Sequence, residues 1–137
     1  MKNHPNTKQV PLYNSRIFIN YIKLIKKHYC HVNIPEILES AHMKSYEIAD
    51  EGHWFTQEQV NLFHKKLSQL TNNENIAREA GRFAASPEVI GSMRKYVLGM
   101  VSPAKAYELA GNAARKYTKA TKYESIKLND NKVEIRI

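Results

Sequence analysis

The segment YESIKLNDNKVEIRI, residues 123–137, decides the fold class of this chain. Apolar and polar side chains alternate on both sides of the turn-forming triplet at residues 129–131, whereas the sequence before it has the spacing of successive helices. Alternation around a short turn is typical of a β-hairpin. We therefore expect an antiparallel hairpin in which Val133, Ile135 and Ile137 pack on the preceding helices.

The hairpin also bears on how the chain is organised. An isolated two-stranded ribbon is marginally stable in water, so this one needs further structure to pack against. The sequence stops within the second strand, without a cap, a Gly, a Pro or a polar tail. We expect the front part of a longer protein, or a strand edge completed by another subunit. Within it we expect a flexible arm at residues 1–12 and a single helical domain at residues 13–137.

The first helices are marked by their capping residues. Asn14 or Ser15 can cap a helix over residues 16–29, because a short polar side chain accepts a hydrogen bond from the first turn. The helical spacing of this segment predicts a buried stripe. Its members are Ile17, Tyr21, Leu24, Ile25 and His28. Asn33 caps a short helix with proline in its first turn, residues 45–49 form another turn, and residues 50–55 form a loop carrying two aromatic side chains inward.

The later helices have clearer start signals. Thr56 and Gln59 form a capping box for a helix to about Leu70, and Asn72 or Asn73 opens the next one. Two Ser-Pro steps then start helices over residues 87–100 and 103–117, which should pack antiparallel because their connection is short. The buried face of the capping-box helix should contain Val60, Phe63, Leu67 and Leu70. The fold class is α+β, mainly α, with five to seven helices followed by a C-terminal antiparallel β-hairpin.

Composition places the chain among ordinary soluble domains. It has 42% hydrophobic and 25% charged residues, and no apolar run is long enough to cross a membrane. The N-terminus lacks the apolar core of a secretory signal. A single cysteine, Cys30, excludes an internal disulfide and suits a reducing compartment. We expect a cytoplasmic protein without membrane insertion.

The net charge of +8 raises the question of nucleic acid. Basic residues cluster at residues 23–27, 94–95 and 115–122, but acidic residues are interspersed and no block reaches five like charges. Solvated helix faces explain this pattern better than a nucleic-acid footprint does. A nucleic-acid-binding transcription regulator module is the alternative function.

The cluster His28, Cys30 and His31 contains good ligands for zinc or haem iron. These side chains are one to three residues apart at a helix end and point in different directions, and no second cluster completes the set. A histidine favoured by the helix dipole is the better interpretation. We expect no metal and no cofactor, with a haem or metal sensor as the second alternative.

Several residues are candidates for a small-molecule site. His53 and Trp54 combine an aromatic surface with a polar neighbour, as binding pockets do, although the same segment also suits a hydrophobic staple before the Thr56 helix. Polar contacts between helices, with each other or with a ligand, are the expected role of Arg82, Arg94, Tyr96 and Tyr107. A structural ion pair from Arg82 to Glu79 or Glu108 is the simpler interpretation.

No catalytic motif identifies a reaction. The sequence has no glycine-rich phosphate loop, and no nucleophile and base stand at a recognisable spacing. We expect a non-enzymatic domain.

The order of segments resembles known sensory domains. Residues 37–43, 50–56 and 70–81 (ILESAHM, DEGHWFT and LTNNENIAREAG) are similar to the N-terminal, arabinose-binding-like half of AraC-type regulators. Residues 102–107 and 119–124, with the hairpin, resemble haem-NO-binding and vinyl-reductase-type sensory folds. The proximal haem histidine and the Tyr-Ser-Arg propionate pattern of the haem family have no counterpart, since the segment Tyr13-Asn14-Ser15-Arg16 lies too early.

The resemblance implies the N-terminal input domain of a bacterial signal-transduction protein, of the sensor histidine kinase type. Such a domain binds a small molecule or a partner protein domain and forms a homodimer. We expect the site between the Trp54 loop and the two Ser-Pro helices, with the hairpin as the output.

Overall fold

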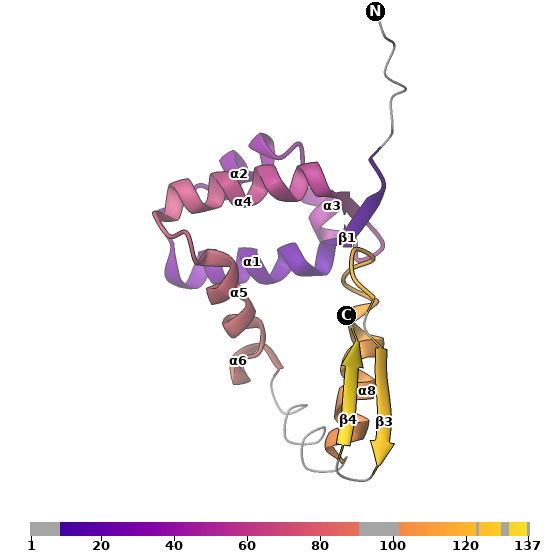
Figure 1. Ribbon diagram of the computed structural model, residues 1–137. Helices are drawn as coiled ribbons and strands as arrows, with labels where there is room; N and C mark the ends of the chain where they lie inside the picture. Colours follow the sequence, from indigo (N-terminus) through magenta and orange to yellow (C-terminus); the bar gives the residue numbers. More distant parts are fainter. Residues whose placement is uncertain (1–8, 91–101, 123, 130–131, 137) are drawn as a thin grey trace, which may run out of the picture.

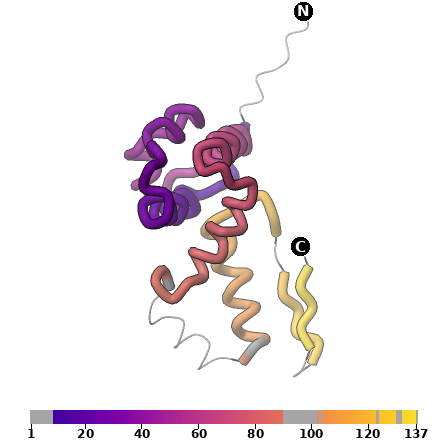
Figure 2. The backbone as a smooth tube through the Cα atoms, turned by 90° about the vertical axis from the view of Figure 1, so that its left-hand side faces the viewer, coloured from indigo at the N-terminus to yellow at the C-terminus, as the bar shows by residue number. Residues whose placement is uncertain are grey.

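The computed structural model describes residues 9–90, 102–122, 124–129 and 132–136. In this part of the chain it has seven helices and four strands, the last two forming an antiparallel hairpin. The mainly α, α+β fold with a terminal hairpin is thus confirmed. Figures 1 and 2 show two regions, which we call the helical lobe (residues 9–90) and the C-terminal unit (residues 102–136).

Helix α1 (Ser15–His28) begins after Asn14, whose side chain accepts a hydrogen bond from the Arg16 backbone N–H at 3.0 Å. Its buried face contains Phe18, Tyr21, Leu24 and Ile25. The predicted stripe was wrong in two places, since His28 is exposed and Ile17 is only half-buried. The reason is Phe18, whose ring makes edge-to-face contacts with Phe55 and Phe63 and so fixes the face of the helix that is buried.

The start of the chain's described part is a strand and not an arm. β1 (Pro11–Asn14) pairs antiparallel with β2 (Trp54–Thr56), so the predicted flexible arm does not extend to residue 12. The last two residues of the predicted loop at residues 50–55 belong to β2, because they pair with β1. The alternation is too short in each strand to predict the pairing from sequence.

Helices α2 (Ile34–Ser40) and α3 (Ser45–Ala49) lie where their signals predict them. The Asn33 side chain accepts from the Glu36 backbone N–H at 3.4 Å, and Pro35 stands in the first turn of α2. Ile37, Leu38 and Ile48 are buried. These short helices therefore contribute to the core of the helical lobe.

Helix α4 (Gln57–Thr71) begins with the predicted capping box. The Gln59 backbone N–H donates to Thr56 Oγ1 at 3.3 Å, and the Thr56 N–H donates to Gln59 Oε1 at 3.1 Å. Val60, Phe63 and Leu67 are buried, while Leu70 is half-buried. The buried face of this helix is confirmed except at its last position.

The helix after α4 begins later than predicted. α5 (Ile76–Ala84) follows Asn75, whereas Asn72 ends α4 in the left-handed conformation with φ 52°. The Asn73 side chain accepts from the Asn75 backbone N–H at 2.9 Å. The asparagines are therefore used for the turn between the helices, because Asn tolerates the left-handed region better than most residues do.

The Ser-Pro steps both start helices. α6 (Pro87–Ile90) follows Ser86, and the remainder of the helix predicted over residues 87–100 lies outside the described residues, as does its packing. α8 (Pro103–Ala114) follows Ser102, whose hydroxyl accepts from the Lys105 backbone N–H at 3.3 Å. α8 ends three residues before the predicted position, because residues 117–119 form extended contacts with β1.

The hairpin consists of β3 (Glu124–Asn129) and β4 (Lys132–Arg136). Ser125 lies opposite Ile135, and an irregularity between Lys127 and Asn129 makes Leu128 an extra residue in β3. The apolar side chains are therefore divided between both faces. Our expectation that Ile135 packs into the helices was wrong, since it is 48% exposed; Val133 is half-buried, and Ile137 lies outside the described residues.

Candidate functional site

A groove of about 440 Å³ lies between α8 and the hairpin. Figures 1 and 2 show α8 lying along the two strands. Its lining consists of Tyr107, Ala110, Gly111, Ala114, Tyr117, Thr118, Glu124, Ser125 and Ile135. Small side chains from α8 leave the space open, and two tyrosines and an isoleucine supply most of the large apolar surface. Apolar surface with a few polar groups is the usual composition of a small-molecule site.

The C-terminal unit is unusually open around this groove. No side chain that the structure describes in residues 102–136 is buried, whereas all buried apolar side chains of the described chain belong to the helical lobe. Tyr107 is 50% exposed and Tyr117 is 38% exposed. The groove therefore offers apolar surface whose removal from water by a bound molecule is favourable.

The C-terminal unit joins the helical lobe through residues 117–119. The Asn14 backbone N–H donates to the Tyr117 carbonyl at 2.8 Å, and the Lys119 N–H donates to the Leu12 carbonyl at 2.8 Å. Thr118 lies opposite Tyr13 in an antiparallel bridge. Because Tyr117 and Thr118 also line the groove, one short segment belongs both to the groove and to the contact with β1.

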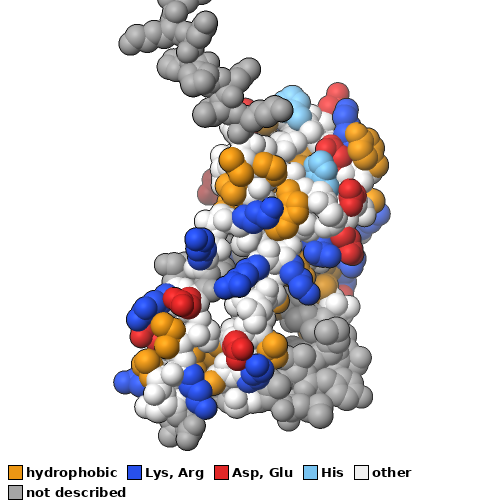
Figure 3. Space-filling model, turned by 90° about the vertical axis from the view of Figure 1, so that its right-hand side faces the viewer, with side chains coloured by type: hydrophobic (Ala, Val, Ile, Leu, Met, Phe, Trp, Pro, Cys, Tyr) orange, Lys and Arg blue, Asp and Glu red, His pale blue; other side chains and the backbone are white. Residues whose placement is uncertain are grey.

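Trp54 lies beside this junction. It pairs with Asn14 across the small sheet, is half-buried, and has the Lys119 ammonium 4.1 Å from the centre of its ring. This is a cation–π contact. Figure 3 views the molecule from the right-hand side of Figure 1. Lys and Arg side chains gather across the middle of the face seen there, between two groups of hydrophobic side chains.

The loop before Trp54 is held by two buried polar side chains. Asn14 Nδ2 donates to the carbonyls of Glu51 and His53 at 2.9 and 3.4 Å, and the Ser15 hydroxyl donates to the Asp50 carbonyl. Arg16 forms an ion pair with Glu51 at 3.1 Å. Residues 14–16 therefore hold this loop against the start of α1. Sequence reasoning recognised only the capping role, because the loop carbonyls have no signature in the sequence.

The predicted site residues occupy different places. His53 Nε2 lies 3.0 Å from Glu47 Oε2, and its ring packs 4.6 Å from that of Phe55, so its side chain belongs to the helical lobe. Tyr107 lines the groove, and Trp54 contacts Lys119, the residue after the lining residue Thr118. The structure thus connects Tyr107 and Trp54 indirectly through residues 117–119.

Arg82 is exposed on α5 and does not line the groove. The ion pair expected for it is not formed with either predicted partner. Glu79 accepts hydrogen bonds from Tyr29 and Asn73, and Glu108 pairs with Lys105 at 3.1 Å. The other two candidates, Arg94 and Tyr96, lie outside the described residues.

A polar pair joins α1 to α4, in which Tyr21 is buried and His64 is half-buried. The Tyr21 hydroxyl lies 2.6 Å from His64 Nε2. Burial raises the pKa of the Tyr21 hydroxyl to about 12 and lowers the pKa of the His64 imidazole below its ordinary value. Neither residue lines the groove, so this pair contributes to the core and not to the candidate site.

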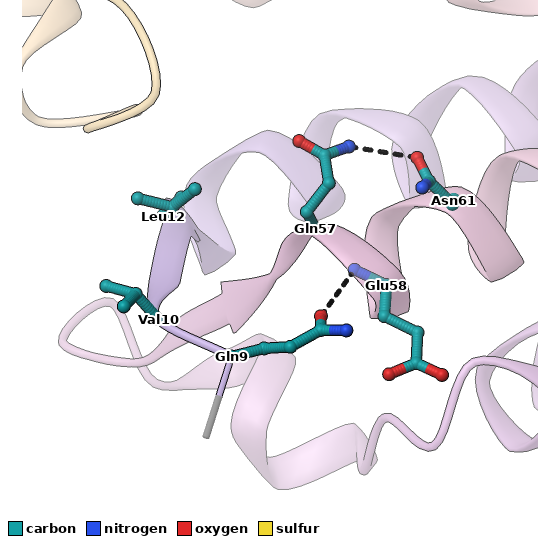
Figure 4. A pocket seen from close by; sticks show the side chains of 6 residues that line it. All are labelled: Gln9, Val10, Leu12, Gln57, Glu58 and Asn61. Carbon is teal, nitrogen blue, oxygen red and sulfur yellow. Dashed lines mark hydrogen bonds between the residues drawn. The ribbon is translucent and has the colours of Figure 1, made fainter. Parts of the chain in front are cut away.

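A second hollow, of about 450 Å³, lies beside β1 and the start of α4 (Figure 4). Two hydrogen bonds join residues of its lining: Gln9 Oε1 accepts from the Glu58 backbone N–H at 3.1 Å, and Gln57 Nε2 donates to Asn61 Oδ1 at 2.9 Å. Four of its six described lining residues are polar, so it offers less apolar surface to a ligand than the groove beside α8 does. We regard the groove beside α8 as the better candidate.

His28, Cys30 and His31 were considered above as metal ligands and set aside. His28 and His31 are exposed at and after the end of α1, and Cys30 Sγ lies 3.1 Å from the Lys26 carbonyl. Within the described ranges, no three His, Cys, Asp or Glu side chains gather as they do around a metal ion. No described helix is both long and apolar enough to cross a membrane.

No protein family, curated protein or solved structure matches this chain. The function is therefore inferred from the groove and its junction with the helical lobe.

Proposed function

We propose that this chain is a non-enzymatic, cytoplasmic input domain of a bacterial signal-transduction protein, of the type that precedes a histidine kinase. Its ligand is a small molecule bound in the groove between α8 and the hairpin. The observation that carries this proposal is the double use of Tyr117 and Thr118. Both line the groove, and both contact β1 of the helical lobe.

This arrangement gives a physical route from binding to output. A ligand changes the population of two arrangements only if it binds them with different affinities. A molecule in the groove contacts α8, the hairpin and residues 117–118 together, so it favours the arrangement in which these elements enclose it best. The resulting shift changes the contact with β1 and the position of Lys119 over Trp54.

The test uses an uncharged apolar dye, N-phenyl-1-naphthylamine, titrated into the whole chain. We expect saturable binding, which the substitution Ala110→Phe weakens at least tenfold by filling the groove. Ala113→Phe is the matched control, because Ala113 is exposed on the same helix and does not line the groove. Equal weakening by both substitutions, or by neither, would contradict the groove as the site.

A second titration reports on the route to the lobe, because Trp54 is the only tryptophan. The dye is excited away from tryptophan, so Trp54 emission is followed with a transparent competitor, cyclohexylbenzene. We expect a saturable change in Trp54 emission that Ala110→Phe abolishes. Binding without any change in Trp54 emission would mean that the chain binds the ligand but does not transmit binding to the helical lobe.

We propose a homodimer as the form in which the domain acts. Leu128 and Leu109 are 54% and 40% exposed, and within the described residues the β3–β4 hairpin has no third strand. Exposed apolar surface beside an open strand edge favours association with another chain. Sedimentation equilibrium should give twice the mass of the chain, and Leu128→Lys should shift it toward the monomer.

Nucleic-acid binding is the second candidate, favoured by the basic residues that follow α8. Arg115, Lys116, Lys119 and Lys122 stand within eight positions on an exposed segment. Such a cluster gives salt-sensitive attraction to phosphates. Titration of a random duplex at two salt concentrations tests it, and affinity that survives moderate salt would favour this candidate over the input domain.

A further inference from the structure

We propose that the ligand of the groove is an apolar organic cation, with an aromatic or alkyl body along α8 and a protonated amine beside Glu124. The inference rests on the proposed function, since it assigns a chemical class to the ligand of the same groove. Its basis is the charge of the lining and the distribution of ion pairs in the C-terminal unit.

Among the described residues that line the groove, Glu124 is the one that carries a charge at neutral pH. The other described carboxylates of the C-terminal unit have cationic partners. Glu108 pairs with Lys105 at 3.1 Å, and Glu134 pairs with Arg136 at 2.9 Å. Glu124 forms no ion pair or hydrogen bond of its side chain with a described residue, although Arg136 lies opposite it in the hairpin. A cationic ligand would supply this missing partner.

The rest of the lining suits an apolar body. Ala110, Gly111 and Ala114 leave room along α8, while Ile135 faces them from the hairpin. From Tyr107 to Ala114 the helix rises about 10 Å, which is the length of a fused bicyclic ring with a short side chain. The tyrosine rings add a second attraction for a cation, because the face of an aromatic ring is negatively polarised.

The basic residues of the unit do not contradict a cationic ligand. None of the described Lys and Arg residues of the unit lines the groove. Lys105 and Arg136 are engaged in ion pairs, and Lys119 lies over Trp54. An anionic ligand of the same shape would instead place its charge in a groove whose own charge is the Glu124 carboxylate.

The test compares three ligands of similar shape on the whole chain by calorimetry: 2-(1-naphthyl)ethylammonium, 2-(1-naphthyl)ethanol and 1-naphthylacetate. We expect the ammonium to bind about fivefold more tightly than the alcohol, the order expected for one partly exposed ion pair, and the acetate to bind most weakly. Glu124→Gln should make the ammonium and the alcohol equal without changing the affinity of the alcohol.

Glu108→Gln is the matched control, because it removes a carboxylate of the same unit that does not line the groove. It should leave the fivefold preference in place. Equal binding of ammonium and alcohol to the unaltered chain, or tighter binding of the acetate, would overturn the cation assignment while the groove stays the site. Binding of N-phenyl-1-naphthylamine without binding of any of the three naphthyl ligands would also overturn the cation assignment. A different result would show that the groove is not the ligand site: in that case Ala110→Phe would leave the affinity of the alcohol unchanged.

Discussion

The ammonium of Lys119 lies 4.1 Å from the centre of the Trp54 ring and so links the C-terminal unit to β2 of the helical lobe. The backbone of the same lysine donates to the Leu12 carbonyl at 2.8 Å. Side chain and backbone thus hold two different strands of the small sheet. A rearrangement of the C-terminal unit that moves Lys119 would therefore change its contacts with both strands.

We predict that Lys119→Met changes Trp54 emission while leaving the fold intact. Methionine keeps the length and the backbone donor of the residue but removes the charge, so about 0.5–1 kcal/mol of cation–π energy is lost. The emission spectrum should shift, and the midpoint of urea unfolding should fall slightly. Lys122→Met is the control, because Lys122 is exposed and contacts no described aromatic ring. A spectrum that changes equally in both variants would mean that Lys119 has no special contact with Trp54.

We predict a larger effect for Asn14→Ala. Asn14 is 1% exposed, accepts from the Arg16 N–H at 3.0 Å and donates to the Glu51 carbonyl at 2.9 Å. The substitution removes a helix cap and leaves a loop carbonyl without its donor, which should cost about 2–3 kcal/mol. Urea denaturation measures the loss.

Asn61→Ala is the matched control for Asn14. Asn61 is exposed within α4, where alanine is the better helix former, so the free energy of unfolding should change by less than about 0.5 kcal/mol. Similar losses in both variants would show that the hold of Asn14 on the loop contributes little.

Local signals predicted where the helices begin, because caps act within a few residues. The Thr56 capping box, the Asn33 cap and the Ser102 step all start helices where expected. Tertiary contacts decided the remaining features. Phe18 is fully buried only because Phe55 and Phe63 meet its ring, and no local pattern distinguishes this residue from Ile17.

The candidate site was less accessible to sequence analysis. Trp54 and Tyr107 were identified by residue type, but the groove depends on α8 meeting a strand pair 10 or more residues later in the chain. Glu124 received no role, since an isolated carboxylate at a strand start looks like ordinary surface. The shift at Leu128 also escaped detection, because regular alternation predicts a regular register.

We predict that the protein loses stability in alkali through Tyr21. Burial raises the pKa of its hydroxyl to about 12 in the folded protein, against 10.0 for the free side chain. Its contribution is therefore fully present below pH 10 and is lost as the pH rises from about 10 to 12, because the unfolded chain releases the proton first. The difference between the free energies of unfolding at pH 9 and at pH 11 should be smaller in Tyr21→Phe than in the parent protein. An equal divergence in that variant would mean that Tyr21 ionises like an exposed tyrosine.

The partner of Tyr21 gives the opposite prediction in acid. Burial lowers the pKa of His64 below 6.5, so the unfolded chain takes up a proton that the folded protein resists. The stability that depends on neutral His64 is present above about pH 6.5 and declines as the pH falls toward the folded pKa. We expect the free energy of unfolding to fall less between pH 7.5 and 5.5 in His64→Gln than in the parent protein. The glutamine amide oxygen can still accept a hydrogen bond from the Tyr21 hydroxyl, which lies 2.6 Å from His64 Nε2 in the parent. His42→Gln is the control, because His42 is exposed and should leave the difference between the two pH values unchanged. A smaller pH dependence in His42→Gln than in His64→Gln would assign the acid sensitivity to the surface and not to the pair of Tyr21 and His64.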